Sequence, residues 1–297
     1  MYDNASLKIT VFTPSYNRAK FLPRIYQSLC EQNFQGFEWI IVDDGSKDET
    51  SSIVEGLAQD SPFPIHYRYK ENGGKHTAIN LGVTMAVGEL FFILDSDDYL
   101  CPNSLSKVWN TYLGVRGNDD FAGVAGLLVH SDGKVIGITP SQDNLDCTPV
   151  EYWTYYDLSS DKCEVLRTDV FREIPFPEVP NEKFCPEELE WCRISKKYKL
   201  RYSKSVLAVR DYLEGGLTAN IVKIRMTSPQ LTMMDYKEYL YFPETAFRTK
   251  IKNAINYWRF RFCLSVKSNV KISWIWSFVA PLGFIMHLRD LAIIKKR

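Results

Sequence analysis

Apolar residues in the first hundred positions occur in short continuous runs, each followed by polar residues and then by a stretch with helical spacing. The runs predict buried strands at residues 8–13, 37–42, 65–70 and 91–94, because strands covered on both faces lack alternating polar positions. The stretches between them predict helices at about residues 18–31, 48–59 and 75–87. Strands that alternate with helices indicate an α/β fold with a mostly parallel sheet, flanked by helices and joined by right-handed crossovers.

The pattern beyond residue 101 is less regular. We expect a helix from Pro102 to about Val115, a strand at 123–129, and a hairpin turn at Asp132-Gly133 with a returning strand at 134–138. The aromatic stretch 152–156 predicts no regular element. A helix is expected from Cys185, because acids open this stretch and bases close it.

Polar residues follow each of the four predicted strands of the first hundred positions. They are Pro14–Asn17, Asp43 with Asp44, Asn72–Lys75, and Asp95–Asp98. Ligands of such sheets bind outside the carboxyl ends of the strands, so we expect these residues to line one crevice. Any one cluster alone would be interpreted as an ordinary loop, but four at successive strand ends favour a binding site.

Asp95 and Asp97 are separated by one residue at a strand end, where two carboxylates repel unless a cation lies between them. Carboxylate oxygens suit Mg²⁺ or Mn²⁺, and Mg²⁺ is usually held by one or two carboxylates plus substrate phosphates. The expected substrate is therefore a phosphate ester. The sequence contains no GxxxxGK[ST] motif, and ENGGKHTAIN lacks its spacing, which argues against a P-loop nucleoside triphosphatase.

Four motifs, TVFTPSYNR, IIVDDGSKDET, ENGGKHTAINLGV and DSDD, resemble in order and spacing the nucleotide-sugar domain of family 2 glycosyltransferases. The resemblance is continuous over about residues 7–105 and thinner to about residue 215. It implies the Rossmann-like GT-A fold and an inverting sugar transfer from a nucleoside diphosphate sugar, with Mg²⁺ or Mn²⁺ on the diphosphate. We accordingly expect a GT-A domain at residues 1–220, with a nucleotide-sugar-binding half at 1–105 and an acceptor half at 106–220. A helical extension would follow at 221–297.

The resemblance also assigns roles to the residues at the strand ends. Asp44 would accept a hydrogen bond from the uracil imide, Lys75 would approach the nucleotide or its phosphates, and Asp95 would face the ribose or the donor sugar. Asp97 would hold the metal, with Asp95 as a second ligand. The full nucleotide-sugar set is Pro14, Tyr16, Asn17, Asp43, Asp44, Asn72, Lys75, Asp95 and Ser96. For Asp43 and Asp98 structural roles stay open, namely orienting a turn and capping the next helix.

An inverting transfer needs a base that takes the proton of the acceptor hydroxyl. In the family this base belongs to a Glu-Asp pair that opens a later helix, and Glu187-Glu188 corresponds to that pair. Glu188 is therefore the candidate base, with Glu187 beside it, although the family usually has aspartate at this position. The alternative is that these acids only stabilise a helix N-terminus. Gly215–Thr218 follows where the family has a closing loop, but it could equally form a simple turn.

The 36 basic and 36 acidic residues cancel, so the total charge gives no indication of nucleic-acid binding. Their distribution is uneven, because residues 245–297 contain eleven lysines and arginines but one acid, Asp290. Within this segment, 272–286 has fifteen residues without a charge, fewer than the about 20 that a spanning helix needs. Pro281 and Gly283 also interrupt it.

This basic segment also contains Trp274 and Trp276, residues that suit the boundary between water and lipid. It therefore predicts a peripheral anchor on the anionic inner leaflet. The alternative is a helix pair docked on the protein core. Seven scattered cysteines and an N-terminus without an apolar leader favour a cytoplasmic protein at the inner face of the cell membrane.

The resemblance and the basic segment together predict the partners. The donor would be a UDP-sugar, and the acceptor a polyprenyl-diphosphate-linked saccharide of bacterial polysaccharide biosynthesis. Two other interpretations stay open. One is a transferase that uses simple polyprenyl phosphate as its acceptor, and the other is a non-catalytic nucleotide-sugar-binding module at the membrane.

Overall fold

The computed structural model describes residues 7–156, 158, 161–210 and 220–295. The chain forms two compact units. The first contains the described residues of Met1–Pro175 and Ile194–Asp211, and the second contains those of Phe176–Arg193 and Tyr212–Arg297. The segment Gly215–Thr218, for which a closing loop or a turn was expected, lies outside the described residues.

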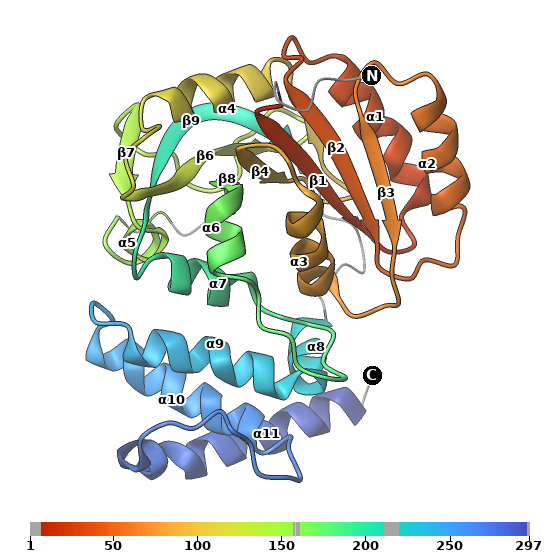
Figure 1. Cartoon of the computed structure of the whole chain (residues 1–297). Coiled ribbons are helices and arrows are strands. Elements are labelled where there is room, and N and C mark those ends of the chain that lie inside the picture. Colours follow the sequence, from red (N-terminus) through yellow and green to blue (C-terminus); the bar gives the residue numbers. More distant parts are fainter. Residues whose placement is uncertain (1–6, 157, 159–160, 211–219, 296–297) are drawn as a thin grey trace. The chain divides into compact units, whose positions relative to one another are not determined.

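The first unit is built on a nine-stranded sheet (Figure 1). Four strands run parallel in the order β3-β2-β1-β4, and three helices and one 3-10 helix connect them. The strands are β1 (Ile9–Ser15), β2 (Phe37–Asp43), β3 (Ile65–Tyr69) and β4 (Leu90–Ile93); the helices are η2 (Ala19–Phe21), α1 (Leu22–Cys30), α2 (Thr50–Gln59) and α3 (Lys75–Met85). This confirms the four strands and three helices predicted for the first hundred residues.

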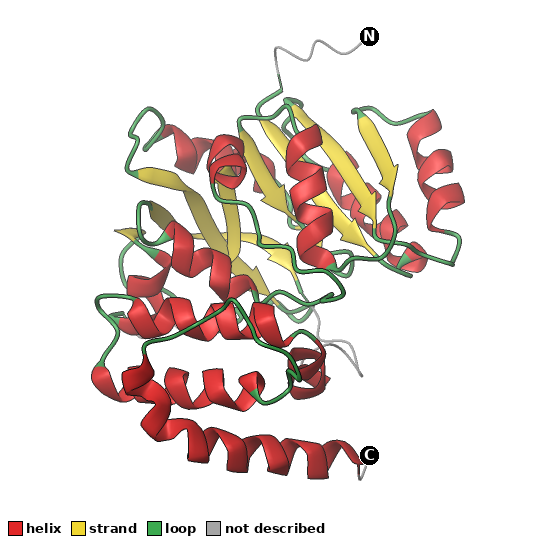
Figure 2. Ribbon diagram, turned by 60° about the horizontal axis from the view of Figure 1, so that its bottom comes forward, coloured by secondary structure: helices red, strands yellow, loops and turns green. Residues whose placement is uncertain are grey.

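Strand β1 is buried on both of its faces, as its uninterrupted apolar run predicts. Ile9 and Val11 belong to the same apolar cluster as Leu22 of α1. Phe12 points to the other face, where α3 comes so close that a Cβ on Gly82 would lie 2.2 Å from the Phe12 ring. Helices therefore cover this part of the sheet on both faces, as Figure 2 also shows.

The remaining strands make the sheet mixed. β8 (Cys163–Arg167) is antiparallel to β4 and to β6 (Phe121–Val129), whereas β9 (Lys199–Val209) is parallel to β6. The short strands β5 (Tyr99–Leu100) and β7 (Asn144–Cys147) both pair antiparallel with β9. In the described residues, three helices accompany this half: α4 (Ser104–Leu113), α5 (Pro149–Thr154) and α6 (Thr168–Glu173). The parallel arrangement predicted from the sequence thus holds for β1–β4 and for the β6–β9 pair.

The aromatic stretch 152–156, predicted to be irregular, instead belongs largely to helix α5 (Pro149–Thr154). A capping box starts this helix. The Thr148 hydroxyl accepts a hydrogen bond from the Glu151 N–H at 3.1 Å, and the Glu151 carboxylate accepts one from the Thr148 N–H at 2.8 Å. This local signal outweighs the low helix propensity of the aromatic residues that follow.

The returning strand predicted at residues 134–138 is not formed. The turn itself exists, with Gly133 at a φ of 84° and its N–H donating to the His130 carbonyl at 2.8 Å. Beyond it, the described residues form only an isolated bridge between Val129 and Val135. The segment 134–138 is largely exposed, so it lacks the apolar contacts that would hold a second strand.

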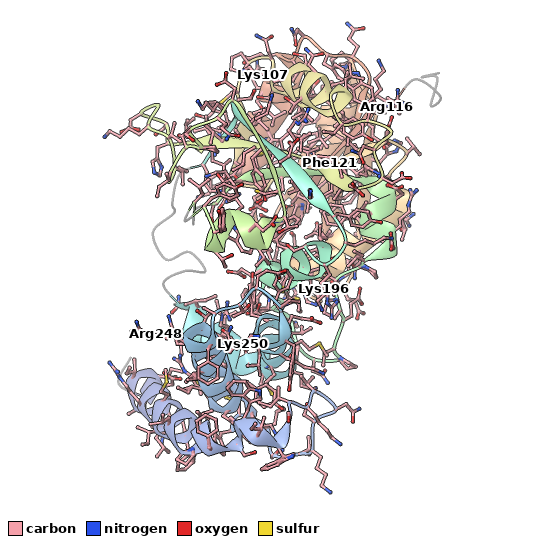
Figure 3. The ribbon with its side chains drawn as sticks, turned by 90° about the vertical axis from the view of Figure 1, so that its left-hand side faces the viewer. Lys107, Arg116, Phe121, Lys196, Arg248 and Lys250 are labelled. Atoms are coloured by element: carbon pink, nitrogen blue, oxygen red, sulfur yellow. The ribbon has the colours of Figure 1, made fainter. Side chains whose placement is uncertain are left out.

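In the described residues of the second unit, the regular structure is helical. Its elements are α7 (Glu187–Ile194), α8 (Ile221–Thr227), α9 (Pro229–Tyr241), α10 (Phe247–Arg261), η4 (Trp274–Val279) and α11 (Ala280–Lys295). Met233 of α9 shares an apolar cluster with Tyr257 and Phe260 of α10. Arg248 and Lys250 lie near the start of α10 (Figure 3). The helix predicted from Cys185 exists as α7, but it ends at Ile194, and the bases expected to close it lie partly in β9, which begins at Lys199.

The apolar stretch near the C-terminus is not interrupted at Pro281, contrary to the sequence prediction. Pro281 occupies the first turn of α11, where a residue needs no N–H donor for the helix. Elements η4 and α11 therefore run on from Trp274 to Lys295 as 22 residues, within which an 18-residue window has a mean hydropathy of 1.5. By length and composition alone, this helix could cross a membrane.

Candidate active site

Residues Asp95–Asp98 form a turn just after β4, and this turn is called the acidic turn below. The Leu94 N–H still donates to the Phe12 carbonyl of β1 at 2.8 Å, and the Asp98 N–H then donates to the Asp95 carbonyl at 3.0 Å. Arg24 of α1 donates to the main-chain carbonyl of Asp97 at 2.5 Å. The turn is thus held to its neighbours through its backbone, which leaves its side chains available for other contacts.

One cation, Arg210, binds two carboxylates of this turn. It follows the last residue of β9, and its Nε and Nη2 lie 2.8 and 2.7 Å from Asp98 Oδ2. Its Nη2 also lies 3.1 Å from Asp95 Oδ2, and its Nη1 lies 3.4 Å from Asp161. The second Asp95 oxygen, Oδ1, is 2.5 Å from Nζ of Lys75, the first residue of α3. Both Asp95 oxygens are therefore paired with cations.

These contacts give the carboxyls of the turn different acidities. Burial disfavours the charged form of Asp95, but the charges of Lys75 and Arg210 outweigh it and hold the pKa of this carboxyl below its usual value. For Asp98, burial and the nearby Asp95 charge raise the pKa to about 7, against the favourable charge of Arg210. Asp98 Oδ1 is buried and has no hydrogen-bond partner within the described ranges.

The third carboxylate, Asp97, is the one most open to a ligand. Its side chain is 30% exposed, and its nearest cation is Arg18, whose Nη2 lies 3.9 Å away. No group of three or more histidines, cysteines, aspartates or glutamates suited to a metal occurs in the part of the chain that the structure describes. One carboxylate together with substrate phosphates is nevertheless a common Mg²⁺ environment, so Asp97 fits a divalent ion. Asp95 could share that ion only after releasing Lys75 or Arg210.

Asp44, which follows β2, has a closed set of partners. Its Oδ1 accepts hydrogen bonds from the Gly73 N–H at 2.8 Å and from Lys70 Nζ at 2.7 Å. Its Oδ2 accepts from the Gly74 N–H at 2.7 Å and from Asn72 Nδ2 at 3.1 Å. A carboxylate has about four acceptor positions, so all of them are used. Asp44 shapes the loop before α3, and a uracil imide would have to replace one of these donors.

Asp43 and Asn17 tie the loops after β2 and β1 together. Asp43 accepts hydrogen bonds from the Ser46 N–H and from the Tyr67 hydroxyl, each at 2.7 Å, so its side chain orients the turn. Asn17, at a φ of 52°, donates its N–H to Ser46 Oγ and accepts from the Lys47 N–H, each at 2.8 Å. These contacts place the two loops at the same edge of the sheet.

The other predicted nucleotide-sugar residues also lie at this edge. Pro14 is paired with Val42 near the carboxyl end of β1, and Tyr16, just beyond it, is 49% exposed. Ser96 is buried within the acidic turn. The structure therefore brings the predicted set of the first unit to the carboxyl ends of β1, β2 and β4 and the start of α3. Sequence reasoning missed Arg210, Lys70, Arg24 and Arg18, the cations that organise this edge.

Glu187 and Glu188 belong to the second unit, in the first turn of α7. Glu188 is half-exposed, and its carboxylate lies 4.0 Å from Nη2 of Arg225. Its main-chain carbonyl accepts a hydrogen bond from the Tyr239 hydroxyl at 3.4 Å. Arg225 in turn lies 3.1 Å from the buried Asp235, whose pKa burial raises to about 7. The geometry allows Glu188 both to stabilise the helix start and to receive a proton from a ligand.

We expect the Arg210→Gln variant to be less stable than the wild type by about 2–3 kcal/mol, slightly below the cost of breaking a fully buried ion pair. The reason is that Asp98, which is nearly fully buried, would lose its counter-ion. Adding Asp98→Asn should recover most of the loss, because both members of the pair are then neutral. Urea unfolding of the wild type, both single variants and the double variant measures this coupling.

A matched control is Arg116→Gln, which removes an ion pair of similar length, 2.9 Å to Glu89, from an exposed arginine. It should cost at most about 1 kcal/mol. If Asp98→Asn fails to recover stability in the Arg210→Gln background, the two side chains are not coupled as the contacts indicate.

Residues 10–144 match the sequence model of the family described as Glycosyl transferase family 2. An uncharacterised glycosyltransferase of Nostoc sp. is 34% identical over 102 residues, which cover 34% of this chain and 32% of that protein. Residues 10–144 are a family 2 glycosyltransferase domain. A second relative is the GalNAc(5)-diNAcBac-PP-undecaprenol beta-1,3-glucosyltransferase of Campylobacter jejuni, 32% identical over 134 residues, or 43% of this chain and 40% of that protein. The chain thus spans about a third of the length of the first curated relatives that it matches.

Solved structures share the fold of this chain beyond the matched domain. S. aureus TarS 1–349 in complex with UDP-GlcNAc superposes with a TM-score of 0.62 at 20% identity, covering 96% of this chain and 81% of that one. The mannosyltransferase PcManGT from Pyrobaculum calidifontis, in complex with GDP-Man and Mn²⁺, gives 0.56 at 15% identity, covering 98% and 77%. The GT-A fold predicted from the motifs is confirmed.

Proposed function

We propose that this glycosyltransferase transfers a sugar, with inversion, from a UDP-sugar to a hydroxyl of a lipid-linked saccharide in bacterial polysaccharide biosynthesis. One observation carries the proposal. Asp97 of the family 2 domain is an open carboxylate at the carboxyl edge of the parallel strands, and Asp95, two residues before it in the same turn, binds the two cations Lys75 and Arg210. This pairing of an exposed acid with fixed cations suits a metal-bound diphosphate.

The loops after β1 and β2 would take the nucleoside of the donor. Tyr16 presents an exposed ring, and Asn17 is held in position by the Ser46 loop. Asp44 would act mainly through the Gly73-Gly74 backbone that it orders. The UDP-GlcNAc complex of the TarS neighbour supports a uridine nucleotide. Because the other neighbour binds GDP-Man, the screen described below includes both UDP- and GDP-sugars.

Asp97 would hold Mg²⁺ or Mn²⁺, and a bound ion would neutralise charge on the departing diphosphate. Lys75 and Arg210, which bind the oxygens of Asp95 in the structure, would bind phosphate oxygens of the donor. Glu188 would accept the proton of the acceptor hydroxyl as that oxygen attacks the anomeric carbon. Arg225, partly neutralised by Asp235, would orient the Glu188 carboxylate, with Glu187 beside it in the same helical turn.

The acceptor proposal rests on a relative and on the basic segment. The Campylobacter jejuni relative carries undecaprenol-linked diphosphate saccharide in its name, which supports a polyprenyl-diphosphate-linked acceptor here. Such a substrate is confined to a membrane. The eleven bases of residues 245–297 would favour the anionic inner leaflet, so we place the enzyme peripherally on the cytoplasmic face of the membrane.

The test is a donor and acceptor screen with the full chain. UDP- and GDP-sugars are incubated with Mn²⁺ and with undecaprenyl-diphosphate-linked saccharides in detergent, and nucleotide release, product mass and anomeric configuration are measured. We expect UDP release that requires the saccharide acceptor and an inverted product. Transfer to undecaprenyl phosphate alone would assign the simpler acceptor. Donor binding with no release for any acceptor would contradict an enzyme and support a binding module.

A further inference from the structure

Helix α11 has its polar and apolar faces reversed relative to a helix of a water-soluble protein. Its buried positions are Gly283, His287 and Asp290, which lie on one face because they are four and three residues apart. Its apolar side chains point outward instead. The exposed ones of η4 and α11, here called the outward face, include Trp274, Ile275, Phe278, Leu282, Ile285 and Leu288, exposed by 49–85%.

The buried face of α11 is fixed to α10 by specific contacts. A Cβ on Gly283 would lie 2.6 Å from the Trp258 side chain and 2.9 Å from the Arg259 nitrogen, so only glycine permits this approach. Asp290 accepts two hydrogen bonds from the Arg259 guanidinium, at 2.5 and 2.7 Å. The helix is therefore held in one orientation, and its apolar side chains are exposed by this packing rather than by lack of a partner helix.

These contacts also argue against a transmembrane course for α11. The helix docked behind it, α10, carries five bases in fifteen residues: Arg248, Lys250, Lys252, Arg259 and Arg261. A charged side chain costs about 2.5–3.5 kcal/mol at the centre of a bilayer, so α10 would not follow α11 into the hydrocarbon. A spanning α11 would have to leave α10 and break the buried ion pair of Asp290.

Charge identifies the occupant of the outward face. Residues 245–297 have eleven bases and the single acid Asp290, and Arg259 already neutralises that acid. The outward face is thus an apolar stripe in an otherwise basic segment, with Trp274 at one end. Tryptophan, aliphatic side chains and surrounding bases together match the headgroup and upper acyl region of an anionic leaflet.

We propose that the outward face of η4 and α11 lies in the plane of an anionic bilayer, with α10 behind it and no segment of α11 crossing. The proposal rests on the proposed function only for its purpose, which is to bring the enzyme to a lipid-linked acceptor. Arg289 is exposed in α11 and would extend its guanidinium to the headgroups.

The experiment measures flotation of the full chain with two kinds of vesicle, phosphatidylcholine alone and phosphatidylcholine with phosphatidylglycerol. No sugar nucleotide is present, so the result is independent of transferase activity. The wild type should float with the anionic vesicles only. The double variant Phe278→Glu/Ile285→Glu should bind at least about tenfold more weakly, because two apolar anchors become charged. Extraction at alkaline pH should release bound wild-type protein, as for a peripheral protein.

A matched control is Val266→Glu, which adds a charge to an equally exposed apolar position, 67%, in the same basic segment but outside the outward face. It should bind like the wild type. Circular dichroism and thermal unfolding verify that each variant is folded. Resistance to alkaline extraction would assign a spanning helix. Equal loss of binding by both variants, or binding that ignores lipid charge, would overturn the proposal. So would a wild-type oligomer that becomes monomeric in the double variant without any vesicle binding.

Discussion

Replacing Asp97 by asparagine is expected to lower kcat/KM for sugar transfer by about 10²–10³-fold, the loss typical when one electrostatic contact to a developing charge is removed. Asp97 is the carboxylate of the acidic turn without a close cation, so it is the residue that can bind a divalent ion without first breaking another pair. UDP release over a series of Mn²⁺ concentrations measures the effect. The variant should require more Mn²⁺ for half-maximal rate, because the amide oxygen carries no charge.

The control for this experiment is Asp132→Asn. Asp132 is an exposed acid of the first unit that pairs with Lys134 at 2.8 Å in a turn remote in sequence from the acidic turn. Its replacement should leave both the rate and the Mn²⁺ requirement unchanged. An Asp97→Asn enzyme that is fully active and indifferent to metal would remove Asp97 as the metal ligand.

The Glu188→Gln variant is expected to lose about 10²–10⁴-fold in kcat, the usual contribution of a positioned general base. Donor binding should be unchanged, because the substitution keeps the shape of the side chain and alters only its ability to accept a proton. Rapid-quench turnover and donor affinity, measured separately, show whether the loss lies in the chemical step. Glu188→Asp should keep part of the activity, since aspartate is the usual residue at this position in the family.

Glu187→Gln separates catalysis from helix stabilisation. Both glutamates lie in the first turn of α7, so a purely structural role predicts similar small losses of stability, about 0.3–1 kcal/mol, for either change. A base at Glu188 predicts a much larger loss of kcat for Glu188→Gln than for its neighbour. Equal rates for the two variants would show that neither glutamate receives the proton.

The parallel half of the sheet could be predicted because its signals are local. Strand β1 is buried on both faces, and its sequence shows this directly as an unbroken apolar run. Strand β9 could not be predicted in the same way. Its burial alternates irregularly, and its pairing with β6 contains register shifts, so its periodicity is broken. Its position depends on β6, which lies far away in the sequence.

Because the sequence did not predict β9, it also did not predict the position of Arg210, which follows this strand. The rule that located the acidic turn, polar residues after an apolar strand end, applies equally to the apolar residues 206–209 followed by Arg210. Applied there, it would have placed a cation at the same edge as Asp95. The contrast between Asp44 and Asp97 is harder to predict, because both are aspartates after buried strands. Only the folded chain shows that one has four donors and the other is open.

Arg210 reaches Asp98 and Asp95 across 112 and 115 residues of chain. Long-range pairings of this kind form late, since the loop between the partners must close first. As the ribosome releases the chain, strands β1 to β4 can assemble well before β9 has emerged, but β4 then has a bare edge until β8 arrives. A nascent chain that stalls in this interval would expose that edge. Its acidic turn would also lack the ion pairs with Arg210. Holding chaperones would therefore be most needed in the middle of translation, and binding of the sugar nucleotide would become possible only near its end.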